Sequence, residues 1–185
     1  SQELISAISE GKNVKAVAVI YKVSPYAFAS LKYKNIKSPS DFKGKILGAS
    51  GGNDQAYITY SALLGLNGIN SNQVTFKDLG FDPVDDIVSN NADVVDLYRT
   101  DQSYLLDKKG ADYNLIYPEE FGFEQYGDVI SASNVLIDND PNTTRAFVTA
   151  TLKGWKFAID NIDETIEILK KYENELYKDE EYERY

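Results

Sequence analysis

Two short stretches of this chain hold residues whose types and spacing could bind a ligand. The first separates an apolar run from a helical pattern and consists of Ser50, Gly51, Gly52, Asn53 and Asp54. If a strand passes there into a helix, free backbone N–H groups and the Ser50 hydroxyl lie at the positive helix end, where glycines let a ligand approach the main chain. The same residues also suit a tight turn in which Asn53 or Asp54 is only the N-cap. The spacing matches neither a phosphate loop nor a dinucleotide fingerprint.

The second stretch follows the apolar run "ADVVDLY" and consists of Tyr98, Arg99, Thr100 and Asp101. If that run is a parallel strand, these residues lie at its carboxyl end, where open α/β sheets bind their ligands. Arg99 could hold an anion through two parallel hydrogen bonds, or it could form a salt bridge with a nearby Asp on an acidic surface. The stretch therefore predicts a second part of a binding site and leaves its charge preference open.

Acidic residues also gather in "PEEFGFEQYGD", which contains Glu119, Glu120, Glu124, Tyr126 and Asp128. Paired carboxylates can perform glycosidase acid–base chemistry, but nothing in the sequence sets their separation, and a solvated loop explains them better. The chain contains no histidine and no cysteine. This composition excludes disulfides, thiol nucleophiles, Ser-His-Asp triads and nearly all zinc sites within these residues. An enzyme built from these residues alone would therefore have to rely on carboxylates, tyrosines and lysines.

The composition is that of a globular domain rather than a disordered segment. Of the 185 residues, 43% are hydrophobic and 26% are charged, with a formal net charge of −10. An acidic surface would repel phosphates, so nucleic acid is not an expected partner. No apolar run reaches the roughly 18–20 residues that a membrane-spanning helix requires.

Hydrophobic periodicity predicts the elements that position the two stretches. Strands are expected over residues 46–49, 74–80, 92–98, 113–118 and 128–137, and one or two extended segments over 14–33, broken at Ser24-Pro25. Helical patterns cover residues 4–10, a short turn at Pro39–Phe42, the segment after the glycines up to Gly68, and two segments capped by Asp82 and by Thr100 or Asp101. Strands and helices alternate over 46–117, so we predict a mainly parallel α/β sheet covered on both faces.

Three predicted helices, two of them after Asp140, have a recognisable apolar face. After the glycines, the shared face comprises Ala56, Tyr60, Leu63 and Leu64. A helix opening at Asp140-Pro141 presents Phe147, Ala150, Gly154, Trp155 and Ala158 on one side. A last helix is predicted to begin with a capping box of Asn161 and Glu164 and to turn inward Ile162, Ile166, Leu169 and Tyr172. After Asp140 the alternation of strands and helices gives way to two successive helices. This change indicates a chain that leaves one lobe, builds a second and returns.

In their order, three segments resemble one known family. They are "IKSPSDFKGKILGASGGND", "VTFKDLGFDPVDDIVSNNADVVDLYRTDQSYLL" and "EEFGFEQYGDVISASNVLIDNDPNTTRAFVTATLKGWKFAID". The chain resembles the solute-binding proteins of the thiamine-pyrimidine, sulfonate and nitrate uptake family from about Val14 to Tyr172. The resemblance implies an α/β, periplasmic-binding-protein-like, two-lobed (type II) fold with the N-terminal part missing. It implies a first-lobe tail and crossover over 1–29, a complete second lobe with a parallel or mixed sheet over 30–132, and a return to the first lobe over 133–185.

The resemblance also implies which residues bind the ligand. The loop facing the cleft corresponds to Ser50, Gly51, Gly52 and Asn53; the family's "Y.tN" segment to Tyr98, Thr100 and Asp101; and its "fYgD" segment to Tyr126 and Asp128. Asp101 replaces the family's usual Asn. A carboxylate there would repel sulfonate or nitrate and suit a ligand that offers N–H donors, such as an aminopyrimidine, whereas Arg99 points toward an anion.

The function that this resemblance implies is binding of a small solute outside the cytoplasm, with no catalytic residues, no metal and no cofactor. The ligand would be a nitrogen heterocycle or a sulfonate-like solute, delivered to the permease of an ABC importer. One alternative is the same module as the outer sensing domain of a membrane receptor, such as a histidine kinase. Another is an enzyme, because fungal pyrimidine-precursor synthases share the fold, although they depend on histidine and cysteine chemistry that this chain lacks. We expect a periplasmic or extracytoplasmic location, with a membrane anchor open.

Overall fold

The computed structural model describes residues 2–51, 54–80 and 82–172. Contacts divide the chain into two compact units. The sheet unit comprises Pro25–Gln125, and the helical unit comprises Ser1–Ser24 together with Tyr126–Tyr185. The unit boundaries therefore lie a few residues before the predicted lobe boundaries at 29/30 and 132/133. The reason is strand pairing, because residues 26–31 pair inside the sheet unit and residues 129–133 pair inside the helical unit.

The sheet unit is built on one mixed sheet of five strands in the order β4-β3-β5-β2-β6. The strands are β2 (Tyr26–Leu31), β3 (Ile46–Ser50), β4 (Thr75–Leu79), β5 (Val94–Tyr98) and β6 (Tyr113–Ile116). β3 is parallel to both β4 and β5, whereas β2 is antiparallel to β5 and β6. The α/β class and the mixed sheet are thus confirmed. The expectation of a mainly parallel sheet was incomplete, because β2, the first strand of this sheet in the sequence, lies antiparallel between β5 and β6.

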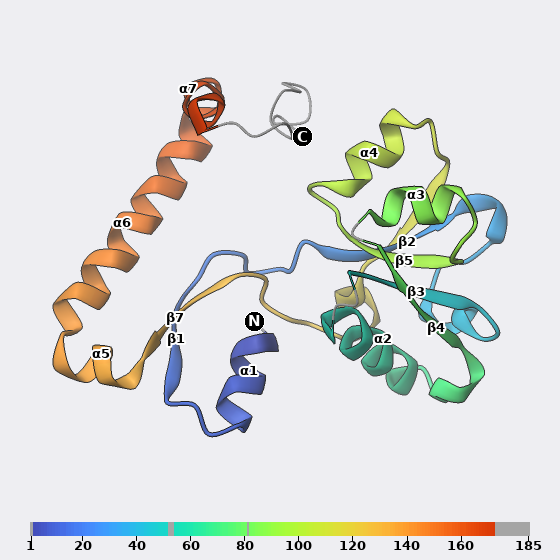
Figure 1. Cartoon of the computed structure of the whole chain (residues 1–185), viewed down its shortest axis with the longest axis horizontal. Helices are drawn as coiled ribbons and strands as arrows, with labels where there is room; N and C mark the ends of the chain where they lie inside the picture. Colours follow the sequence, from blue (N-terminus) through green and yellow to red (C-terminus); the bar gives the residue numbers. More distant parts are fainter. Residues whose placement is uncertain (1, 52–53, 81, 173–185) are drawn as a thin grey trace. The chain divides into compact units, whose positions relative to one another are not determined.

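Helices cover both faces of this sheet, as Figure 1 shows for α2 (Asp54–Leu66) on one side and α3 (Pro83–Val88) and α4 (Gln102–Lys108) on the other. All six residues of β2 are buried. Tyr26 and Phe28 join the core under α2, and the alternating Ala27 and Ala29 join the core under α3 and α4, as the twofold period of a strand requires. The predicted inner face of α2 is confirmed, since its four residues are all buried: Ala56, Tyr60, Leu63 and Leu64.

Local capping signals account for several element starts. Pro39–Phe42 forms a 3-10 turn closed by a capping box between Ser38 and Asp41. Asp82 is the N-cap of α3 and accepts a hydrogen bond from the Val84 backbone N–H, with Pro83 in the first turn. Three other 3-10 turns in the sheet unit cover Lys32–Lys34, Ser71–Gln73 and Pro118–Phe121.

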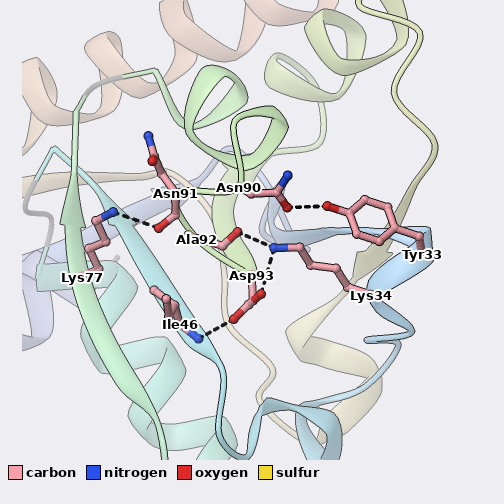
Figure 2. Close-up of polar contacts among 8 residues, drawn as sticks. All are labelled: Tyr33, Lys34, Ile46, Lys77, Asn90, Asn91, Ala92 and Asp93. Atoms are coloured by element: carbon pink, nitrogen blue, oxygen red, sulfur yellow. Dashed lines mark hydrogen bonds and ion pairs between the residues drawn. The ribbon is translucent and has the colours of Figure 1, made fainter.

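The amino ends of β3 and β5 are tied together by an ionic cluster. Lys34 Nζ donates to Asp93 Oδ1 at 2.8 Å and to the Ala92 carbonyl at 3.1 Å, while the Ile46 backbone N–H donates to Asp93 Oδ2 at 2.9 Å. Figure 2 shows this cluster of Lys34, Ile46, Ala92 and Asp93. It also shows two neighbouring hydrogen bonds, Tyr33 to Asn90 and Lys77 to the Asn91 carbonyl. Burial raises the pKa of Asp93, but the Ile46 N–H and the Lys34 ammonium outweigh it, so the net pKa lies below its ordinary value.

We expect Asp93→Asn to lower the free energy of unfolding at pH 7 by about 1–3 kcal/mol, because it removes the charge from two charge-assisted hydrogen bonds. A depressed folded pKa contributes stability that is present above the unfolded pKa, near ~3.9, and is lost as pH falls through the folded pKa. The difference from the parent should therefore shrink below about pH 4. Urea unfolding across pH 3–7 measures it. The control Asp112→Asn, at an exposed pair with Lys32, should cost under ~1 kcal/mol. A difference equal at pH 3 and pH 7 would contradict the ionic role.

The helical unit contains a two-stranded antiparallel ribbon and four α-helices within the described residues. β1 (Val14–Val19) pairs with β7 (Val129–Ser133), and the helices are α1 (Gln2–Ser9), α5 (Asn134–Asn139), α6 (Pro141–Asp160) and α7 (Ile162–Leu169), with a last 3-10 turn at Lys170–Tyr172. The predicted strand over 128–137 is wrong beyond Ser133. The Ser133 hydroxyl accepts a hydrogen bond from the Leu136 N–H and caps α5, so the chain turns helical there. Asp140 and Pro141 open α6 as predicted.

The apolar side predicted for α6 and the inward side predicted for α7 and the turn after it are mostly exposed in the residues that the structure covers. Phe147 is 62% exposed and Tyr172 is 81% exposed, whereas Ile166 is buried. Trp155 packs edge-to-face on Tyr21 at 5.6 Å between ring centroids. Helical spacing identifies which face is apolar, but it does not identify what covers that face.

The predicted capping box of the last helix is also wrong. Asn161 occupies the N-cap position of α7 without a side-chain cap bond, because its Nδ2 donates back to the Phe157 carbonyl at the end of α6. Within residues 2–51, 54–80 and 82–172, no helix combines the length and apolarity needed to cross a membrane.

Candidate functional site

The two predicted binding stretches of the sheet unit meet at one edge of its sheet. Parallel strands end at the same edge, and the register places Ser50 of β3 opposite Leu79 of β4. β5 lies on the other side of β3 and ends at Tyr98. The antiparallel β2 begins at this edge, because Tyr26 lies opposite Tyr98. We call this the carboxyl edge, and it is opposite the ionic cluster at the amino ends of β3 and β5.

Of the glycine stretch, the structure describes Ser50, Gly51 and the start of α2 at Asp54, while Gly52 and Asn53 lie outside the described residues. Gly51 has a left-handed backbone with φ +62°, which a glycine adopts without strain. Its N–H donates to the carbonyls of Leu79 at 3.2 Å and Gly80 at 3.0 Å. The turn is thus bound to the end of β4.

A buried aspartate that the predicted site did not include organises this turn. Asp96 is only 4% exposed. Its Oδ1 accepts hydrogen bonds from the Ser50 backbone N–H at 2.7 Å and from the Ser50 hydroxyl at 2.8 Å. Its Oδ2 accepts one from the Tyr26 hydroxyl at 3.0 Å. Burial first, and then the negative charge of Asp96, raise the pKa of Tyr26 far above its ordinary value. An acidic residue inside the apolar run "VVDLY" was the available signal.

These contacts correct one expectation about the turn. The sequence predicted free backbone N–H groups in this turn, but those of Ser50 and Gly51 are already bound within the protein, and Gly52 and Asn53 lie outside the described residues. The Ser50 hydroxyl likewise donates to Asp96. The main chain of the turn at Ser50 and Gly51 therefore offers no N–H donor to an anion.

Tyr98 and Arg99 occupy the middle of the carboxyl edge. Tyr98 is 39% exposed and packs edge-to-face against Tyr26 with 6.0 Å between ring centroids. Of the two alternatives for Arg99, the structure shows the ion pair, although with a Glu: Nη1 lies 3.3 Å from Glu119 Oε1. Its guanidinium also lies 5.0 Å from the ring centroid of Tyr117. The charge of Arg99 is therefore balanced at this edge.

Thr100 and Asp101 lead from β5 into α4. Thr100 is exposed, and Asp101 is half-buried at the N-cap position of α4 without a side-chain cap bond. Its Oδ2 instead accepts a hydrogen bond from Gln102 Nε2 at 2.8 Å. The hydrogen bond to Gln102 thus holds the Asp101 carboxylate beside the carboxyl edge, three residues after Tyr98 in the sequence.

The carboxylates of the acidic loop have different surroundings in the described structure. Glu119 pairs with Arg99, and both Glu120 and Glu124 are exposed. In the part of the chain that the structure covers, no cluster of three or more acidic side chains is arranged to hold a metal ion.

Tyr126 and Asp128 belong to the helical unit, where both are exposed. The Asp128 carbonyl accepts the Ile20 N–H at 2.8 Å, next to the β1–β7 ribbon. Burial and, second, the charge of Asp128 raise the pKa of Tyr21. The assignment of Tyr126 and Asp128 to a ligand site stays a prediction.

The described arrangement, a mixed sheet with helices on both faces and loops gathered at the carboxyl edge, is a periplasmic-binding-protein-like fold. A solved structure of the aliphatic sulphonate binding protein SsuA from Escherichia coli matches it with a TM-score of 0.71 at 15% identity, over 91% of this chain and 57% of that one. A sulfonate-binding protein of Methylobacillus flagellatus matches with a TM-score of 0.64 at 24% identity, over 98% of this chain and 54% of that one. At these identities the likeness shows the fold.

The chain belongs to the family described as NMT1/THI5 like, which it matches over residues 1–165. A riboflavin-binding protein, RibY of Chloroflexus aurantiacus, is 25% identical over 165 residues, which is 89% of this chain and 47% of the relative. A formylaminopyrimidine-binding protein of Halalkalibacterium halodurans is 27% identical over 175 residues, 94% of this chain and 53% of the relative. The chain thus spans about half the length of the curated relatives it matches. The predicted relationship to solute-binding proteins is confirmed.

Proposed function

We propose that this chain is part of an extracytoplasmic solute-binding protein that captures a small molecule and presents it to the permease of an ABC importer. The observation that carries the proposal is the meeting of the Ser50–Gly51 turn and the Tyr98–Asp101 segment at one sheet edge, in a chain of this family. Open α/β sheets bind their ligands in crevices at the carboxyl ends of the strands. On this proposal the protein binds its solute without transforming it.

The proposed ligand is a nitrogen heterocycle of the aminopyrimidine kind. Two relatives carry names that state binding of nitrogen heterocycles, riboflavin and a formylaminopyrimidine. At the carboxyl edge, Tyr98 offers a partly exposed ring on which a flat heterocycle can stack. Asp101 offers a carboxylate that can accept N–H bonds, and Arg99 is already paired with Glu119. These features favour a flat N–H donor over an anion.

A thermal-shift and calorimetric screen of the full-length protein tests the binding. Riboflavin, a formylaminopyrimidine, ethanesulfonate and nitrate form the panel. A bound solute at a hundred times its Kd should raise the free energy of unfolding by ~2.7 kcal/mol through mass action. Stabilisation by a heterocycle supports the proposal, and no stabilisation by any member contradicts it. Chemical conversion of a bound member would instead support an enzyme.

Tyr98→Ala is expected to weaken binding of the heterocycle by about tenfold, because stacking on an aromatic ring contributes roughly 1–3 kcal/mol per base. The Kd from isothermal titration calorimetry measures this. Tyr33→Ala is the matched control, since Tyr33 is also an exposed tyrosine of the sheet unit but lies beside the ionic cluster, at the opposite end of the strands. Its Kd should stay within about twofold of the parent. Equal losses in both variants would remove Tyr98 from the site.

A further inference from the structure

The polar groups of the Ser50 turn have a fixed hydrogen-bond polarity. A serine hydroxyl has one hydrogen to donate and two lone pairs with which to accept. The Ser50 hydroxyl lies 2.8 Å from Asp96 Oδ1, which can only accept while ionised. Its hydrogen is therefore directed at Asp96, and only the lone pairs of its oxygen remain available to another partner.

The neighbouring donors are used in the same way. The Ser50 N–H donates to Asp96 Oδ1 at 2.7 Å, and the Gly51 N–H donates to the carbonyls that end β4. The Tyr26 hydroxyl, also at this edge, donates to Asp96 Oδ2 at 3.0 Å. Four donor groups that could have received an anion are consequently satisfied inside the protein.

Among the described residues, no cationic side chain pairs with Asp96. Its hydrogen-bond partners are Ser50 and Tyr26, which are neutral, and no ion pair joins it to a lysine or arginine among residues 2–51, 54–80 and 82–172. A buried charge interacts more strongly with nearby charged and polar groups than an exposed one does, because less water screens it. The rise in the pKa of the buried Tyr60, caused first by burial and then by the charge of Asp96, is consistent with that field.

We propose that Asp96 is a specificity-determining positioning residue: it holds Ser50 as a pure hydrogen-bond acceptor and makes the carboxyl edge select ligands that donate N–H groups over anions. The inference rests on the proposed function, because it needs a solute at this edge. To the proposed binding function it adds the preference of the site for ligands that donate hydrogen bonds. An amino-substituted heterocycle can donate to the Ser50 oxygen, whereas a sulfonate has no hydrogen to donate and meets an uncompensated negative charge.

Asp93, the residue just before β5, supplies a matched control for this role. Asp93 and Asp96 are both acidic residues beside β3, and each accepts a backbone N–H of that strand, Ile46 for Asp93 and Ser50 for Asp96. Asp93 acts at the amino end of the strands, and Asp96 acts at the carboxyl edge. Replacing each by Asn keeps the size of the side chain and removes the charge, so a structural effect common to both is separated from an effect on the site.

The experiment measures the Kd of a formylaminopyrimidine and of ethanesulfonate for the full-length parent, Asp96→Asn and Asp93→Asn by calorimetry. The parent should prefer the pyrimidine by at least about tenfold. Asp96→Asn should reduce this preference by about tenfold, whereas Asp93→Asn should leave it within about twofold. This ratio is a readout that a purely structural role would not move. A preference unchanged in Asp96→Asn, or a parent that binds both probes equally, overturns the inference while leaving the binding function intact.

Ser50→Ala keeps the inference testable if Asp96→Asn does not fold. It removes the acceptor oxygen and should weaken pyrimidine binding about three- to tenfold, the range of one hydrogen bond, without strengthening ethanesulfonate binding. An unchanged Kd for the pyrimidine overturns the inference. Binding of neither probe by the parent is a different result, because it contradicts the proposed function itself along with the inference.

Discussion

Replacing Phe28 by Ala is expected to lower the free energy of unfolding by about 3–5 kcal/mol, the usual cost of emptying an aromatic site in a core. Phe28 lies in the middle of β2, is fully buried, and stacks on Tyr60 of α2 at 4.1 Å between ring centroids with a 27° interplanar angle. Its ring also contacts Phe42 edge-to-face at 6.3 Å. The variant loses the free energy of burying a whole aromatic ring, together with the contacts of that ring. A cavity remains, because the rigid neighbours on a strand and a helix cannot fill the space.

Urea unfolding followed by circular dichroism measures this loss. Phe147→Ala provides the control, because Phe147 is the same residue type on α6 but is mostly exposed. Its cost should stay below ~1 kcal/mol. A loss for Phe28→Ala no larger than that of Phe147→Ala would show that the cluster beneath α2 is not the main core of the sheet unit.

The elements with strong local signals could be predicted from the sequence. The face of α2 follows from spacing alone, because four apolar residues at helical intervals must share one side, and all four are buried. The start of α3 follows from Asp82 and Pro83, whose types suit the N-cap and the first turn. The meeting of the two stretches predicted to bind a ligand follows from topology, because parallel strands bring distant turns to the same edge.

Other features depend on contacts that local patterns do not encode. The position of β2 between β5 and β6 is set by pairing partners about 70 and 85 residues further along the chain. The start of α5 inside an apolar run depends on one hydroxyl, that of Ser133, competing for the backbone. The use of the Ser50 and Gly51 donors could not be predicted either, because their acceptors lie on β4 and β5.

Gly48→Val is expected to cost about 3 kcal/mol of unfolding free energy, at the upper end of the range for overpacking a core. Gly48 lies in β3, where a Cβ would stand 2.3 Å from Leu79 Cδ1, 2.9 Å from Leu79 Cγ and 3.0 Å from Ala92 Cβ. Leu79 is buried and could turn away only by disturbing the core under α3. The Cβ of Ala92 cannot rotate at all, and its main chain is held by Lys34. A glycine within a strand often marks such a close approach.

Gly65→Ala is expected to change the free energy of unfolding in the opposite direction. It therefore shows that the cost of Gly48→Val comes from steric overlap. Gly65 lies on the exposed side of α2, and a Cβ there would meet nothing within 4 Å. Because alanine favours the helix over glycine, this variant should gain about 0.5–1 kcal/mol in the same urea assay. Gly48→Val should in addition weaken ligand binding, since Leu79 supplies a carbonyl that holds Gly51. A stable Gly48→Val protein would mean that β3 and β4 can separate without cost, and the turn at the carboxyl edge would then lack the rigid support that its proposed role requires.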